Sequence, residues 1–316
     1  MATYTTATAI GERESLSNVI SRIDPDETPL YSNGAKVTTK GVFEEWQVQE
    51  LAAAVDTNYV NEGADYSYVN PTATVRLGNY HQISVQAASV SGTLDAVDSA
   101  GRAKETAYVK VLKGIEQRRD IEKALFKNEA RSGSDARKAG KFLSYMTNLE
   151  LISASTTPSG TGVNVSDMAG TNAALTLAKI DGAMKKAYDD GGQPDMMVVS
   201  PANKVAFSDL SSGSAVTNQL HMTAGAPKEA VIIGSVSMYL TDFGQLNVAI
   251  DRQATNTEIF LLDSDYYSIG TLPGRNMAVS DIAATGDATK FSIVTEWTLI
   301  LKAPKAMAAV VDLSTT

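Results

Sequence analysis

Hydrophobic and polar residues alternate along two runs of the chain that a polar segment separates. Residues 42–51 and 72–90 change character at every second position, which is the period of a β-strand. In the first run neither strand face is purely apolar, because Trp46 shares its face with Glu44. The pattern predicts a hairpin over residues 41–92 that reaches away from its own core and needs a neighbouring molecule.

The middle of this hairpin, residues 56–70, carries tyrosines among polar residues. A tyrosine ring is apolar while its hydroxyl stays hydrated, so tyrosines at the tip of a protrusion suit a protein interface. The candidate contact residues are Tyr59, Glu62, Asp65, Tyr66, Tyr68 and Arg76. A solvated loop explains this segment equally well.

A long helix is predicted over residues 99–128, which contain no proline and start at Ser99, a residue suited to cap the first turn. One apolar stripe is expected, formed by Tyr108, Val111, Leu112, Ile115, Ile121 and Leu125. Basic residues gather on the other faces, and they favour a surface that meets nucleic-acid phosphates. The candidates are Arg118, Arg119, Lys123, Lys127 and Arg131. The alternative is a solvated helix with ion pairs four residues apart.

The ends of the chain have different patterns. Residues 1–35 read as an arm interrupted by Pro25 and Pro29, and the alternative is a disordered tail. Near the C-terminus, residues 291–301 alternate as a half-buried strand does. Pro304 ends that strand, and residues 307–313 are expected to form a final short one.

Between them, residues 171–265 have an α/β pattern. One helix starts after Thr176 and stops at Gly191-Gly192, and a second opens at Ser200-Pro201 and runs to about residue 210. Strands are expected at residues 196–199, 231–240, 246–250 and 259–262. This segment is predicted to be a compact subdomain with helices against a small sheet.

The composition is that of an ordinary globular protein, with 43% hydrophobic and 20% charged residues among 316. The net charge of −9 argues against a surface that binds nucleic acid as a whole. The sequence contains no cysteine, which excludes disulfides and thiol catalysis and fits a reducing cytoplasm. No apolar run approaches the roughly 18 residues of a membrane span, so we expect no membrane partner.

Motifs that suggest catalysis are incomplete. Asp242-Phe243-Gly244 copies a kinase tripeptide, but no glycine-rich loop or His-Arg-Asp accompanies it, so a tight turn is sufficient. Residues 133–141 resemble a phosphate-binding loop only loosely, because the glycine spacing is too long and Phe142 replaces the required Ser or Thr.

The sequence offers few candidate residues for a metal site or for acid–base catalysis. The two histidines, His81 and His221, have no nearby ligand at useful spacing and are interpreted as structural. Asp263 and Asp265 lack the remaining ligands of a calcium loop. We therefore predict no catalytic, cofactor-binding or metal-binding residues, and no enzyme activity.

Five short motifs, in this order along the chain, resemble those of tailed-phage major capsid proteins with the HK97-like fold, closest to the SU10-type major head proteins. They are Arg22-Ile-Asp-Pro-Asp-Glu-Thr-Pro-Leu30, Pro194-Asp-Met-Met-Val-Val-Ser-Pro201, Asp242-Phe-Gly-Gln-Leu-Asn-Val248, Leu261-Leu-Asp-Ser-Asp265 and Glu296-Trp-Thr-Leu299. The resemblance spans essentially the whole chain.

The resemblance implies an α+β fold with defined parts. They are an N-arm (1–40), an E-loop hairpin (41–92), a peripheral domain (93–170) that includes a spine helix (99–128), an axial domain (171–265) and closing strands of the peripheral domain (266–316). It also implies a virion protein that forms pentamers and hexamers of an icosahedral or elongated head around double-stranded DNA, assembled in the host cytoplasm. Portal, scaffolding and decoration proteins are the implied partners.

One departure from the family changes the expected mode of assembly. Some relatives crosslink an E-loop lysine to an asparagine of a neighbour, but here no lysine lies between Lys40 and Lys104. We therefore expect a non-covalent clasp, and a separate scaffolding protein. Two alternatives stay open: a cellular nanocompartment shell of the same fold, similar to encapsulins, and an enzyme built on residues 171–265.

Overall fold

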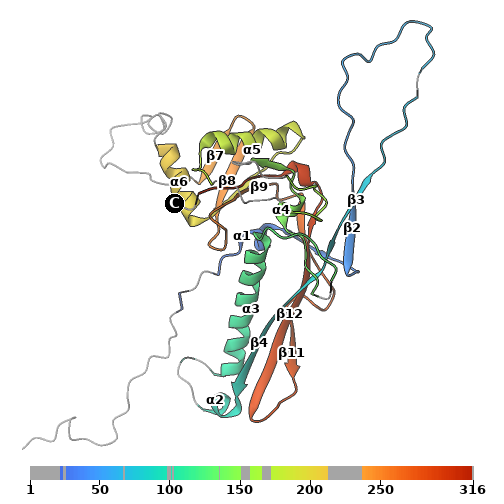
Figure 1. Ribbon diagram of the computed structural model, residues 1–316. Coiled ribbons are helices and arrows are strands. Elements are labelled where there is room, and N and C mark those ends of the chain that lie inside the picture. The colour runs from blue at the N-terminus through green and yellow to red at the C-terminus, as the bar shows by residue number, and fades with distance from the viewer. Residues whose placement is uncertain are drawn as a thin grey trace, which may run out of the picture.

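The computed structural model describes residues 22–23, 26–66, 68–97, 101, 103–134, 136–150, 157–165, 172–212 and 237–314. Two β-sheets and a projecting hairpin make up the molecule, with helices packed on each sheet (Figure 1). Ser99, His221 and the first part of the strand predicted at residues 231–240 lie outside the described residues.

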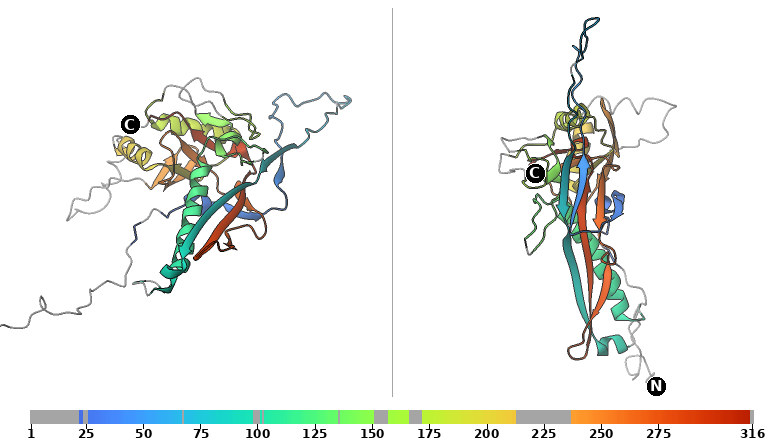
Figure 2. Two further views of the ribbon diagram at one scale, coloured as in Figure 1. Left: turned by 60° about the horizontal axis from the view of Figure 1, so that its bottom comes forward. Right: turned by 90° about the vertical axis from the view of Figure 1, so that its right-hand side faces the viewer.

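The first sheet is built around β12 (Ala288–Leu301). One half of β12 pairs with β10 (Tyr267–Thr271), which also pairs in parallel with β1 (Ala35–Thr38). The other half lies between β11 (Ala278–Ile282) and β4 (Gln82–Ser91). Alternation along β12 buries Phe291, Ile293 and Thr295, so one face of the sheet lies against α3 (Glu105–Leu125), as Figure 2 shows.

The second sheet has the strand order β5-β13-β9-β6-β8-β7. Its strands are β5 (Asn148–Glu150), β13 (Ala308–Val310), β9 (Ile259–Leu262), β6 (Met196–Val199), β8 (Gly244–Ile250) and β7 (Met238–Thr241). Both faces of its centre are buried: in β9, Phe260 packs in one apolar cluster and Leu261 in the other. That explains why β6 and β9 read as continuous apolar runs rather than as alternating ones.

Helices α5 (Leu177–Asp189) and α6 (Pro201–Ser212) accompany the second sheet and confirm the predicted order of elements. Ser200 caps α6, since its Oγ accepts a hydrogen bond from the Asn203 N–H at 3.2 Å. Thr176 stands at the start of α5, but its side chain makes no capping bond. The helix ends where predicted, because Gly191 takes the left-handed conformation with φ +87°.

Short elements link these layers. Helix α1 (Pro29–Asn33) precedes β1, α2 (Gly92–Ala96) follows β4, and α4 (Phe142–Tyr145) precedes β5. A 3₁₀ turn, η2 (Pro304–Ala306), joins β12 to β13. Leu30 and the whole of α4 are buried in the apolar cluster that the first sheet, α3 and the second sheet share.

The predicted hairpin is only partly right. Its ladder is confined to β2 (Phe43–Val48) and β3 (Val75–Tyr80), and residues 49–74 lie outside it. After His81 the return arm becomes β4, which pairs with β12 from Gln82 to Ser91. The alternation of Ile83 and Val85 therefore belongs to the body of the molecule, and a sequence pattern cannot tell which partner a strand pairs with.

The long helix is shorter than predicted at both ends, spanning Glu105–Leu125 rather than residues 99–128. Gly101 has φ +79°, a left-handed conformation that a continuous helix excludes. The cap comes from the preceding helix, because Asp95 of α2 accepts a hydrogen bond from the Thr106 N–H at 3.0 Å. This bond is the main cause that lowers the pKa of Asp95. Helix α3 therefore begins after Lys104, while Ser99 lies outside the described residues.

Two further assignments need correction. The apolar stripe of α3 is split, since Ile121 and Leu125 are fully buried while Val111 is 61% exposed. The final strand, β13, pairs with β5 and β9 in the second sheet and does not return to the first sheet. Its buried run of Ala308 to Val310 suits a strand covered on both faces, as at the centre of the second sheet.

Candidate assembly surfaces

The hairpin leaves the body at a root that is fixed by buried hydrogen bonds. Asn79 uses all four bonds that its amide can make: its Nδ2 donates to Gly140 O (3.0 Å) and Leu299 O (2.8 Å), and its Oδ1 accepts from the Tyr80 and Gly140 N–H groups (2.9 and 2.8 Å). Asn79 is 0% exposed. It therefore ties β3 to both β12 and the loop before α4.

Gly78, one residue earlier, is held by two side chains from outside the hairpin. Its carbonyl oxygen accepts from the Tyr145 hydroxyl at 2.9 Å and from the Arg131 guanidinium. The same guanidinium lies 5.2 Å from the centre of the Phe43 ring, in a cation–π contact. Phe43 in turn packs on Tyr80 across the ladder, with ring centres 4.6 Å apart. The direction of the hairpin is thus set by groups from three separate segments.

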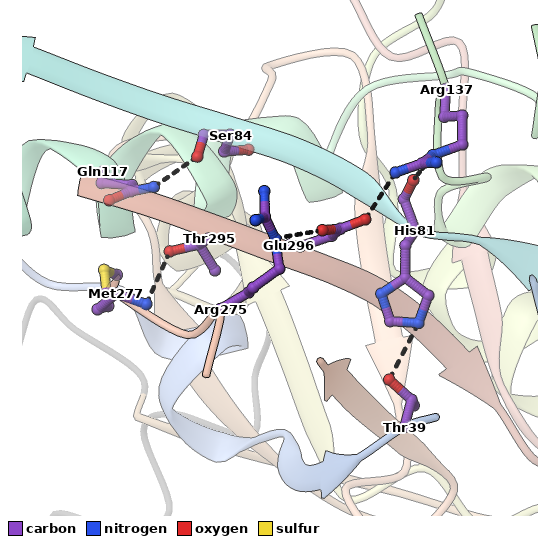
Figure 3. Close-up of polar contacts among 9 residues, drawn as sticks. All are labelled: Thr39, His81, Ser84, Gln117, Arg137, Arg275, Met277, Thr295 and Glu296. Carbon is purple, nitrogen blue, oxygen red and sulfur yellow. Dashed lines mark hydrogen bonds and ion pairs between the residues drawn. The ribbon is translucent and has the colours of Figure 1, made fainter. Parts of the chain in front are cut away.

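A polar junction lies just beyond the root, where β4, β12 and β1 meet (Figure 3). The Glu296 carboxylate, almost fully buried, bonds Arg137 through one oxygen and Arg275 through the other, each at 2.6 Å. Arg137 also donates to the His81 carbonyl, and His81 Nε2 shares a hydrogen bond with Thr39 at 3.0 Å. Burial is the main cause that lowers the pKa of His81. His81 thus joins the hairpin root to the end of β1.

The tip of the hairpin is exposed. Tyr59, Tyr66 and Tyr68 are 80%, 72% and 94% exposed, and Glu62 and Asp65 are exposed too. Leu51, Val60 and Val69 add aliphatic surface that the sequence reasoning did not single out. Arg76 lies lower, in the ladder, where its Nε is 3.5 Å from a Glu45 oxygen. Exposed aromatic and aliphatic side chains gathered in one protruding segment are typical of a surface that meets a partner.

The basic residues of the long helix have different environments. Arg118, Lys123 and Lys127 are exposed, although Lys127 pairs with Glu129 at 3.0 Å. Arg119 is half-buried beside a pocket of 260 Å³ that also involves Arg22 and Tyr108. Arg131 is half-buried and binds the hairpin root through the Gly78 carbonyl, so its guanidinium has a structural role, and its place in the DNA-facing set stays a prediction.

The other candidate motifs are structural where they can be described. Asp242-Phe243-Gly244 forms the tight turn between β7 and β8. Lys141, at the end of the loop that resembles a phosphate-binding one, is fully buried; its Nζ bonds Gln82 at 2.6 Å and lies 4.4 Å from the Trp297 ring centre. Burial lowers the pKa of Lys141 to about 7. A lysine in such surroundings does not reach a phosphate in solvent.

Among the described residues, no three histidine, aspartate or glutamate side chains gather as a metal site. Within the same part of the chain, no helix has both the length and the apolar character needed to cross a bilayer.

Comparison with known proteins decides which family this architecture represents. The sequence profile described as SU10 major capsid protein matches residues 2–314, nearly the entire chain. The chain belongs to the SU10 major capsid protein family. A curated relative, the major capsid protein of Escherichia phage Phieco32, is 26% identical over 312 residues, which cover 93% of this chain and 85% of the relative.

Solved structures confirm the fold. The cyanophage A-1(L) capsid asymmetric unit is similar with a TM-score of 0.65 and 13% identity, covering 98% of both chains. The SrpI encapsulin of Synechococcus elongatus PCC 7942 is similar with a TM-score of 0.56 and 10% identity, covering 97% of this chain and 94% of that one. The fold is the HK97-like α+β capsid fold, and the chain is a structural shell protein of a phage capsid that assembles with copies of itself.

Proposed function

We propose that this SU10-family protein forms pentamers and hexamers of a phage head around double-stranded DNA, and that its hairpin tip clasps a neighbouring subunit without a covalent crosslink. The observation that carries the proposal is the contrast between the rigid root at Asn79 and the exposed tip from Leu51 to Val69. An apolar protrusion held in a fixed direction suits docking on a symmetry-related copy.

We assign the two domains of the head protein to the two sheets. The first sheet with α3 forms the peripheral domain, and the second sheet with α5 and α6 forms the axial domain that meets its copies around the five-fold and six-fold axes. Each contact is weak by itself and is repeated by symmetry, so the shell is stabilised by many interfaces together. The protein performs no catalysis of its own.

The inner surface includes the exposed part of α3. Within the described ranges Arg118 and Lys123 form no ion pair. Two such cations per subunit, repeated over a shell, bind phosphates without reading sequence. A portal, a separate scaffolding protein and a decoration protein complete the proposed set of partners, and assembly takes place in the host cytoplasm.

Removing the hairpin tip tests the proposal. Residues 51–71 are replaced by a short glycine–serine loop, which keeps the β2–β3 ladder and the contact from Glu50 to Lys305 at 2.7 Å. The truncated chain is expected to fold with an unchanged circular dichroism spectrum and to form no particles in negative-stain micrographs when it is expressed with its scaffolding protein. Normal particles from the truncated chain would refute the clasp.

A nanocompartment shell is the second candidate, supported by the similarity to the SrpI encapsulin. The contents of purified particles separate the two functions. A phage head produced in infected cells contains nuclease-protected double-stranded DNA, whereas a nanocompartment contains a protein cargo and no protected DNA.

A further inference from the structure

Two buried carboxyl groups face each other where the arm, the long helix and the second sheet meet. Glu122 lies on α3, and Asp251 follows directly after β8. Both residues are 0% exposed, and Asp251 lies close enough to Glu122 to raise the pKa of its carboxyl group. Two carboxyl groups can share a hydrogen bond only when one of them carries a proton, since an ionised carboxylate has no donor.

The Glu122 carboxyl group also holds the arm. Its two oxygens accept hydrogen bonds from the Leu30 and Tyr31 N–H groups, at 2.6 and 2.7 Å. These are unpaired amides in the first turn of α1, whose own cap residue, Thr28, makes no side-chain bond to them. A residue that lies far along the chain therefore caps the arm helix and fixes it against α3.

Asp251 supplies the connection to the second sheet. Its N–H donates to Val199 O of β6 at 2.9 Å, and its Oδ1 accepts from the Gln253 N–H at 2.7 Å. Its Oδ2 is buried and has no donor among the described residues. A buried carboxylate oxygen without a donor is costly, so a proton shared with Glu122 stabilises the contact.

We propose that Glu122 and Asp251 form a proton-dependent latch that holds α1 against α3 and the second sheet, and that loss of their shared proton releases the arm helix. Without the proton, two negative charges face each other in a site that solvent does not reach. One carboxylate must then leave the site, and the amides of Leu30 and Tyr31 lose their acceptors.

Charged and titratable groups lie around this pair on the neighbouring elements. Lys36 on β1 and Tyr267 on β10 interact with Glu122, and Tyr31 on α1 donates its N–H to it. Arg118 on α3 and Asp195 before β6 act on Lys36 and Tyr267 in turn. Lys36 is the cation that favours an ionised Glu122, but burial lowers the pKa of Lys36 to about 8. Above that pH the lysine loses its charge, and an ionised carboxyl pair then has less compensation.

The direction of the pH effect follows from the carboxyl group. Burial, followed by the contact with Asp251, raises the pKa of Glu122 well above its usual range. The stabilisation from the protonated pair is therefore complete below the ordinary glutamate pKa and is lost as the pH rises through the raised value. The latch is closed in acidic and neutral solution and opens on the alkaline side.

Hydrogen exchange of the full-length chain tests the latch. The protection factor of a peptide covering residues 28–34 is measured from about pH 6 to about pH 10, and in the wild type it is expected to fall about tenfold or more, equivalent to at least one pKa unit. Asp251→Asn is expected to remove this loss, because its Nδ2 donates permanently to the Glu122 carboxylate while its Oδ1 keeps the Gln253 N–H.

Two further variants make the result decisive. Glu122→Gln also replaces the shared proton with a permanent donor and should likewise flatten the pH dependence, even though one arm amide loses its acceptor. Glu258→Gln is the matched control, because burial raises the pKa of Glu258 to about 8 at a separate site, and it should behave as the wild type. An unchanged wild-type protection factor, or an equal loss in Asp251→Asn, overturns the proposal.

Discussion

The root and the tip of the hairpin differ in burial and in hydrogen bonding. At the root, Asn79 is fully buried and all its hydrogen-bonding capacity is used. At the tip, Tyr59 and Tyr68 have most of their surface in solvent and no packing partner is described for them. The root thus contributes to the stability of the folded subunit, while the tip contributes little to it and is free to contribute to assembly.

The largest expected effect is on assembly. Changing Tyr59, Tyr66 and Tyr68 together to serine removes the aromatic surface of the tip, so the yield of particles should fall about tenfold or more, as expected when interface aromatics are removed. The free energy of unfolding of the subunit should change by no more than about 0.5 kcal/mol. Particle yield is measured by size exclusion and electron microscopy, and Tyr266→Ser, on the body, is the control.

Asn79→Ala should have the largest effect on the stability of the subunit. It leaves the carbonyls of Gly140 and Leu299 and the Gly140 N–H without partners, which costs about 3 kcal/mol or more. Denaturant unfolding measures the loss, and Asn58→Ala at the exposed tip should leave the unfolding midpoint unchanged. Equal stabilities of the two variants would contradict the distinction between root and tip.

Glu296→Gln should destabilise the subunit less. Glutamine keeps the shape but removes the charge between Arg137 and Arg275, so we expect a loss of about 2 kcal/mol. Thermal unfolding in low and high salt checks this, since a buried pair is screened little by salt. Glu62→Gln, the same change at the tip, should have no measurable effect on unfolding.

The smallest effect on the subunit should come from the exposed face of α3. Arg118→Gln with Lys123→Gln keeps helix propensity and should leave unfolding and particle yield unchanged. DNA retained per particle should decrease, and the difference from the wild type should shrink at high salt, because the lost phosphate contacts are the salt-sensitive ones. Lys185→Gln with Lys302→Gln removes the same charge elsewhere, and equal DNA loss in that control would show that the effect is not specific to α3.

The sequence predicted the elements of this fold better than their partners. Strands β6 and β9 were predicted with the bounds that they have, because continuous short apolar runs are informative by themselves. The pairing of β4 with β12 and of β13 with β9 could not be read from the chain, because both depend on residues distant in sequence. The cap of α3 by Asp95 was missed because it comes from the separate short helix α2 and not from the residue just before the first turn.

The sequence was also more informative about some residues of the assembly surfaces than about others. The exposure of Tyr59, Tyr66 and Tyr68 agrees with the interpretation of the tip as a surface for a neighbour, which stays a prediction. Arg131 was grouped with the cations of the basic helix, just after its predicted end, and the structure shows that it binds the Gly78 carbonyl. Nothing local in the sequence distinguishes a solvated arginine from one that a distant carbonyl group recruits.

Hydrogen exchange of residues 43–80 in the free subunit and in assembled particles tests the separation of root and tip most directly. The account predicts that amides of β2 and β3 are protected in both states. It also predicts that amides of residues 51–71 gain about tenfold or more protection only on assembly, as for a segment ordered by a partner. Tip amides with the same exchange rate in both states, or root amides unprotected in the free subunit, would contradict it.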